Sequence, residues 1–189
     1  MKAAIFAACL AAMLSAAPAR VGEIADMAKK AEDLAAAGQN LDAIDTMSAA
    51  LAKLWEQSPL VVCKALFVAA EPQGFGIYEV RADSTFKRTE SLVIYAEPVG
   101  YGYATDNGVN TIAFTMDFAV SKRPGEKVAE QKAFGDLTLK SLERNREFFA
   151  KITYDFSGLL PGDYNVTTTL TDKATSKTTD FTLPFTLTD

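Results

Sequence analysis

The hydrophobic pattern of this chain changes its period near Pro59. Before Pro59, apolar side chains recur every three or four residues, as they do along one face of an α-helix. After Pro59 they alternate with polar side chains, as they do along one face of a β-strand. The pattern therefore predicts an α+β protein, with an antiparallel helical hairpin in residues 20–58 and an antiparallel β-sandwich in residues 59–189.

Two apolar stripes define the predicted hairpin. The stripes consist of Ile24, Met27, Ala31 and Leu34, followed by Ile44, Met47, Leu51 and Leu54. Gly38 is a typical C-terminal stop for the first helix, and Ser58-Pro59 ends the second, because a proline disfavours helical geometry in the residue before it. Helices joined by so short a turn are expected to lie antiparallel.

Alternating segments separated by turn sequences predict the strands. These segments are 60–69, 91–97, 110–120, 148–156, 164–170 and 180–187. Turns are expected at 106–108, 123–125 and 160–163, where Asn, Gly, Pro and Asp gather. Residues 128–146 fit either a strand with a loop or a helical turn. About seven short strands of this kind favour a sandwich, and Pro184 places the last strand at an edge or at a bulge.

The turn before Tyr164 resembles a turn of known domains. Leu159-Leu160-Pro161-Gly162-Asp163-Tyr164 is similar to the sequence before the penultimate strand of fibronectin type III and other immunoglobulin-like domains. The resemblance implies a structural corner, in which the Tyr164 hydroxyl bonds to the backbone a few residues upstream.

Two further resemblances concern the hairpin and the longer β-region. The spacing of Ala31, Leu34, Gly38, Ala43 and Leu51 is similar to that of a single tetratricopeptide repeat, although any alanine-rich hairpin gives such a match. Residues 74–100 together with 159–187 resemble a group of uncharacterised exported bacterial proteins with an immunoglobulin-like domain. That resemblance implies a fold and a location, and no activity.

The first 19 residues predict a signal peptide. Lys2 is followed by an apolar run from Ala3 to Leu14 and by Ala17-Pro18-Ala19, a site of the small-x-small type. We expect cleavage after Ala19 and a location in the bacterial periplasm. Lipid attachment at Cys9 is the competing interpretation, but it leaves only eight residues as the signal. No other apolar segment is long enough to predict a transmembrane helix.

Composition restricts the possible functions. The chain has 19 basic and 24 acidic residues, and this excess of acid argues against nucleic-acid binding. Because there is no histidine, the common catalytic triads and most zinc sites are excluded. Cys63 alternates with apolar residues, which predicts a buried structural thiol. We therefore expect no enzyme activity, no metal and no cofactor. A carboxylate-based hydrolase remains an alternative, since it needs no histidine.

Candidate binding and structural residues follow from the loops. Ligand or partner contacts are expected at Trp55, Phe75, Tyr101 and Tyr103. Tyr101 and Tyr103 fit equally well as strand residues packed against the helices. A polar cluster that clamps a loop, or less favourably binds a polar ligand, is expected from Glu79, Arg81, Glu90 and Glu97. The expected partner is another envelope protein, docked on the helical hairpin. The alternative is a small ligand, sugar or lipid held by the aromatic loops. The sequence leaves the oligomeric state open.

Overall fold

The computed structural model describes residues 21–156 and 158–189, so the predicted signal peptide and Arg20 lie outside the described residues. The chain forms two compact units that divide between Lys53 and Leu54. The α+β class predicted from the sequence is confirmed, with two helices followed by a β-rich region. Each unit is described separately below.

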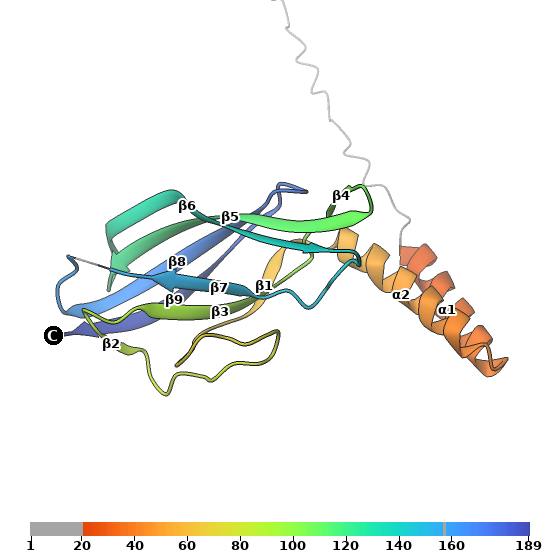
Figure 1. The fold of residues 1–189 in the computed structure, drawn as a ribbon, viewed down its shortest axis with the longest axis horizontal. Helices are drawn as coiled ribbons and strands as arrows, with labels where there is room; N and C mark the ends of the chain where they lie inside the picture. Colours follow the sequence, from red (N-terminus) through yellow and green to blue (C-terminus); the bar gives the residue numbers. More distant parts are fainter. Residues whose placement is uncertain (1–20, 157) are drawn as a thin grey trace, which may run out of the picture. The chain divides into compact units, whose positions relative to one another are not determined.

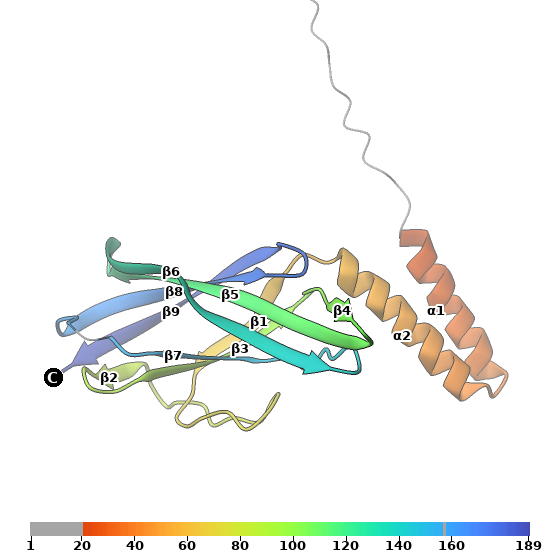
Figure 2. The same cartoon turned by 45° about the horizontal axis from the view of Figure 1, so that its top comes forward.

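The helical hairpin is formed by α1 (Val21–Ala36) and α2 (Asn40–Gln57), and the first unit contains all of it except the last residues of α2, 54–57. The two helices lie side by side in both orientations shown (Figures 1 and 2). Gly38 ends α1 with φ of +77°, and Gln39 donates its backbone N–H to the carbonyl oxygen of Leu34 at 2.9 Å. This is the αL cap expected after a helix, because glycine adopts positive φ without steric cost.

The hairpin packs through small residues. Ala31, Ala43 and Ala50 are buried, so the two helix backbones approach closely. Lys53 adds an ion pair to Glu23 at 2.7 Å. The larger apolar side chains of α2 are consequently not the ones that pack against α1.

The second unit contains two β-sheets. The smaller sheet has the order β1-β3-β7 and is antiparallel; its strands are β1 (Val61–Phe67), β3 (Leu92–Val99) and β7 (Ala150–Tyr154). The larger sheet has the order β2-β9-β8-β5-β4, and β6 also pairs with β5. Its strands are β2 (Thr85–Lys87), β4 (Ala104–Asp106), β5 (Val109–Lys122), β6 (Glu126–Ser141), β8 (Gly162–Asp172) and β9 (Thr178–Thr188). Among the strands of the described residues, only the β2–β9 pair is parallel.

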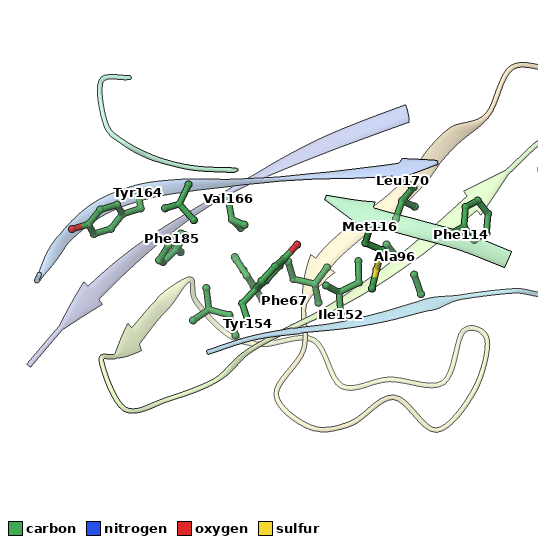
Figure 3. Packing of buried hydrophobic residues seen from close by; sticks show 14 of the residues in the cluster. Phe67, Ala96, Phe114, Met116, Ile152, Tyr154, Tyr164, Val166, Leu170 and Phe185 are labelled. Atoms are coloured by element: carbon green, nitrogen blue, oxygen red, sulfur yellow. The ribbon is translucent and has the colours of Figure 1, made fainter. Parts of the chain in front are cut away.

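One hydrophobic core fills the space between the two sheets. Figure 3 shows Phe67, Ile152 and Tyr154 from the smaller sheet facing Val166 and Phe185 from the larger one. The hydroxyls of Tyr154 and Thr168 form a buried hydrogen bond of 2.7 Å that links β7 to β8. Burial alternates along β7 and β8, as the sequence pattern predicts, whereas β3 is buried on both of its faces.

The undecided stretch 128–146 is mostly strand. β6 runs from Glu126 to Ser141 and pairs with β5 along nearly its whole length, with irregularities opposite Asp117 and near Val120. Asp117 explains the first irregularity, because its carboxylate accepts the backbone N–H of Ala133, whose φ is +48°. A positive φ interrupts the alternation of side chains, which hides the strand in the sequence.

The prediction of a buried thiol at Cys63 is wrong, because this residue is exposed. The register of β1 against β3 shifts between Val62 and Lys64, so Cys63 occupies a β-bulge. A bulge inserts one residue and reverses the alternation of faces beyond it. Val62 and Ala65 therefore pack against the core, whereas the thiol does not. Partial burial and the nearby Glu97 carboxylate raise the pKa of the Cys63 thiol, so it is a poor nucleophile at neutral pH.

Pro184 lies on an exposed part of β9, opposite Asn165 of β8. The other neighbour of β9 is β2, whose pairing covers only Thr186 to Thr188. At residue 184 the strand is therefore a sheet edge, where the missing N–H of a proline costs no hydrogen bond. This is the placement that the sequence predicts.

Candidate functional site

Three of the four predicted binding aromatics form a packed network. The Trp55 indole N–H donates to the carbonyl oxygen of Tyr101 at 2.8 Å, and the two rings meet edge to face at 5.0 Å. The hydroxyls of Tyr101 and Tyr103 both donate to the carbonyl oxygen of Asn145, at 3.0 and 2.8 Å. Tyr101 is only 1% exposed, so its ring is part of the core rather than a surface that a ligand can reach.

Phe75 does not join this network. Its side chain is 38% exposed, and it lies in the loop between β1 and β2. In that loop the backbone N–H of Gly76 donates to the Tyr95 hydroxyl at 2.8 Å, which fixes the loop on β3. Among the ring contacts of the described residues, Trp55, Tyr101 and Tyr103 are joined to one another, and none involves Phe75.

The predicted clamp divides into two clusters. Arg81 donates to a carboxylate oxygen of Glu90 at 2.6 Å and to the carbonyl oxygen of Thr85 at 2.7 Å. Its guanidinium lies 4.1 Å from the centre of the Phe86 ring. These contacts tie together the loop that surrounds β2, which matches the structural interpretation of the pair.

The other two members of the predicted clamp lie elsewhere. The side chain of Glu79 is exposed, and its backbone carbonyl accepts the N–H of Ala69 at 2.9 Å. Glu97 is buried on β3, where it accepts the Tyr95 hydroxyl at 2.7 Å and pairs with Lys64 at 3.3 Å. Burial raises the pKa of Tyr95 to about 12, and the neighbouring Glu97 carboxylate contributes. Tyr95 therefore remains a neutral donor to Glu97 at physiological pH.

A groove that the sequence does not predict lies between β6 and β7. Its volume is about 450 Å³. The lining residues are Leu137, Thr138 and Leu139 of β6, Asn145, Glu147, Phe148 and Phe149 of the connecting segment, and Lys151 of β7. Half of the lining residues are apolar, and Glu147 and Lys151 are charged, a mixture that is usual in a binding site.

Several contacts hold the walls of the groove in place. The two tyrosine hydroxyls fix the backbone of Asn145, and the Asn145 side chain accepts the N–H of Glu147 at 2.7 Å. The Phe149 ring stacks on Tyr95 at 5.3 Å. Lys151 forms an ion pair with Glu71. Tyr101 and Tyr103 thus support the groove from behind rather than line it.

Acidic side chains of the described residues are the remaining candidates for metal binding or acid–base chemistry. Among them, no group of three or more Asp, Glu or Cys side chains gathers as metal ligands would. The buried carboxylates of Glu97 and Asp172 have separate partners, and Asp172 accepts the backbone N–H groups of Gly102 and Ala174 at 2.7 and 2.9 Å. These acids serve as structural acceptors, each in its own hydrogen-bond network.

A second candidate surface is the outer face of α2. Leu41, Ile44, Met47, Leu51 and Leu54 recur at helical spacing and are 44–79% exposed. We call this set the α2 stripe. Side chains of this size are normally buried, and several of them in one row mark an interaction surface. Within residues 21–156 and 158–189, no helix is long and apolar enough to cross a bilayer.

No protein-family model matches the chain, and a comparison with curated proteins finds no relative.

Proposed function

We propose that the β-rich unit is an immunoglobulin-like sandwich. The strand order β1-β3-β7 facing β9-β8-β5-β6 supports this interpretation, because strands from the two halves of the chain interleave in each sheet, as in that fold. The corner before β8 supports it as well: Tyr164 is buried and its hydroxyl donates to the carbonyl oxygen of Leu160 at 2.7 Å. The short parallel pairing of β2 with β9 and the long β5–β6 hairpin are additions to a minimal sandwich.

The protein acts in the bacterial periplasm in this proposal, after cleavage of residues 1–19. The basis is the sequence alone, namely Lys2, the apolar run to Leu14 and the Ala17-Pro18-Ala19 site. N-terminal sequencing of protein recovered from the periplasm is expected to begin at Arg20. A lipid-modified Cys9, or recovery of the chain with Met1 from the cytoplasm, would contradict export as a soluble protein.

We infer that the protein is a non-enzymatic interaction module whose partner is another envelope protein. The single observation that carries this inference is the α2 stripe, a row of exposed apolar side chains about 20 Å long at 1.5 Å per residue. Side chains at this spacing form ridges into which another helix packs. The partner surface is therefore an apolar helical face of similar length.

Site-specific photocrosslinking tests this role. A photoreactive amino acid at Ile44 is expected to yield a discrete crosslinked product in the periplasm. The matched control carries the same group at Lys30, an exposed polar position of α1. Product at Ile44 but not at Lys30 supports the role of the stripe. Equal products at both positions, or none at Ile44, contradict it, and a product of twice the chain mass identifies a second copy as the partner.

The two alternatives have weaker support. A sugar or lipid site built from the aromatic loops needs accessible rings, but Tyr101 is buried, and Phe75 makes no ring contact with it among the described residues. A carboxylate-based hydrolase needs two converging acids, but Glu97 and Asp172 each serve their own hydrogen-bond network.

A further inference from the structure

The groove lies where two sheet edges are unpaired. Within the described residues, β6 pairs only with β5, and β7 pairs only with β3. The backbone N–H and C=O groups on the far side of each strand therefore have no partner strand. Such edges are templates for the addition of a further strand from another chain.

The direction of the free backbone groups follows from the register of β5. The carbonyl oxygen of Ala113 accepts the N–H of Lys173, just beyond β8, at 2.9 Å. The backbone N–H and C=O groups of Ala113 therefore point toward β8. Successive residues of a strand point their peptide groups to opposite edges, so those of Ile112 and Phe114 point toward β6.

The pairing of β6 with β5 shows which β6 residues direct their backbone N–H and C=O groups to the free edge. Leu137 and Leu139 stand opposite Phe114 and Ile112, and they take up the hydrogen bonds from β5. Thr138, which lies between them, points its N–H and C=O away from β5. The pairing between residues 110–116 and 135–141 contains no bulge. The backbone N–H and C=O groups of Asp136 and Lys140 therefore also point away from β5. Thr138 also lines the groove, so the free edge and the apolar hollow meet at this residue.

The side chains of the groove indicate what an added strand would carry. Leu137, Leu139, Phe148 and Phe149 form its apolar part, and 450 Å³ is at the lower end of the range for ligand pockets. Such a hollow suits one large apolar side chain. Because alternate residues of a strand face one side, the residues on both sides of this anchor would point toward solvent.

The charge around the groove differs from that of the whole chain. Residues 137–151 contain four basic side chains against two acidic ones, whereas the chain as a whole has a net charge of −5. On the rim itself, Lys151 is paired with Glu71, and Glu147 also lines the groove. The excess of basic side chains in residues 137–151, rather than Lys151 alone, therefore favours a negative charge beside the apolar anchor, as expected from electrostatic complementarity at interfaces.

We propose that this groove binds an extended peptide segment of a partner protein, which adds as a strand to the free edge of β6. An apolar side chain of the peptide fills the hollow, and acidic residues flank it. The backbone of the peptide exchanges hydrogen bonds with Thr138. This surface is separate from the α2 stripe, so the inference does not depend on the role proposed for the hairpin.

Fluorescence anisotropy with a synthetic probe tests the proposal on the mature chain, residues 20–189. The probe is a fluorescein-labelled heptapeptide of alternating threonine and phenylalanine with an aspartate at each end. Thr138→Pro removes the free N–H of β6 without removing a bond to β5, and Thr138→Val is the matched control. Proline is expected to weaken binding about tenfold or more, and valine less than twofold. Circular dichroism melts show whether the proline variant is folded.

Changes in the peptide give a second test that needs no protein variant. Methylation of the amide nitrogens that face β6 is expected to weaken binding about tenfold, and replacement of both aspartates by lysines about fivefold. Strand addition is wrong if N-methylation has no effect, if the probe does not bind at millimolar protein, or if free toluene displaces the probe completely. The last outcome would instead indicate a site for small apolar ligands.

Discussion

Tyr164 connects the corner before β8 to the core. Its hydroxyl donates to the carbonyl oxygen of Leu160, and its ring stacks on Phe185 with 5.5 Å between centroids. Tyr164→Phe removes only the hydrogen bond and should lower the free energy of unfolding by about 1 kcal/mol. Tyr164→Ala also leaves a cavity and should lower it by about 3–5 kcal/mol. Urea unfolding of both variants measures these differences. If both variants unfold at the same urea concentration as the wild type, the corner contributes nothing to stability.

The buried tyrosines predict sensitivity to alkali. Burial raises the pKa of Tyr95 and of Tyr154 to about 12, compared with about 10 in an unfolded chain. Between these values the folded state keeps protons that the unfolded state releases. The folded state therefore loses stability as pH rises above about 10. We expect the urea midpoint to fall between pH 9 and pH 11.5, and to fall less in Tyr154→Phe. An equal fall in both proteins would exclude Tyr154 as a cause.

At the scale of single residues, the sequence predicts side-chain direction only where the strand is regular. Tyr164 has the geometry expected from the turn that precedes it. Cys63 does not, because a bulge is a property of two paired strands and leaves no mark in the alternation of one. The glycines beside Tyr101 predict a loop, in which the ring either contacts a ligand or packs against the helices. Gly100 and Gly102 instead allow close backbone packing: a Cβ on Gly100 would lie 2.3 Å from the Pro59 carbonyl oxygen.

The C-terminal end of α2 depends on a lysine from the β8–β9 hairpin. Lys177 donates to three carbonyl oxygens, those of Glu56, Ser58 and Gly100, at 3.1, 2.7 and 2.9 Å. The last carbonyls of a helix have no partner within the helix, and a positive charge there also interacts favourably with the helix dipole.

Lys177→Met should therefore lower the free energy of unfolding by about 2 kcal/mol, because it leaves these acceptors unsatisfied. Lys173→Met is the matched control from the same hairpin. Lys173 forms an exposed ion pair with Asp136 at 2.8 Å, and its loss should cost less than about 0.5 kcal/mol. Equal effects of the two substitutions in thermal or urea unfolding would contradict a capping role for Lys177.

Elements with long regular patterns are the ones that the sequence predicts. β5 and β8 alternate over 14 and 11 residues, and both were expected. β2 and β4 have three residues each, which is too short for a pattern to be recognised. β6 is long, but residues 130–133 are all exposed and Ala133 has a positive φ, so the alternation is interrupted in the middle of the strand.

Truncation tests the organisation of the whole molecule. Trp55 belongs to the second compact unit, and its side chain packs against the β-rich core. A chain that begins at Asn40 keeps Trp55, whereas a chain that begins at Pro59, the boundary predicted from the sequence, loses it. The shorter chain should be less stable by about 2–4 kcal/mol, similar to truncation of a partly buried tryptophan. Thermal unfolding of both chains checks this, and identical melting temperatures would show that Trp55 is dispensable.

The candidate groove could not have been predicted from the sequence. Its walls come from residues 137–139 and 145–151, which lie in or beside the stretch without a clear pattern. Their meeting depends on β6 pairing with β5 and β7 pairing with β3, and neither pairing is visible in a single strand. The exposed stripe of α2, in contrast, consists, apart from Leu41, of residues that the helical period groups together in the sequence. What the period does not reveal is that alanines, rather than these larger residues, form the packed face.

The parallel pairing of β2 with β9 determines how the β-rich unit responds to tension. Residues 186–188 have β2 on one side and β8 on the other, and Thr188 accepts the backbone N–H of Arg88 at 3.0 Å. A pull on Asp189 along β9 therefore loads both ladders in shear, so that many hydrogen bonds must break together. A pull perpendicular to β9 would open the same bonds one after another at much lower force. The unit should thus resist stretching in one direction far more than in the other.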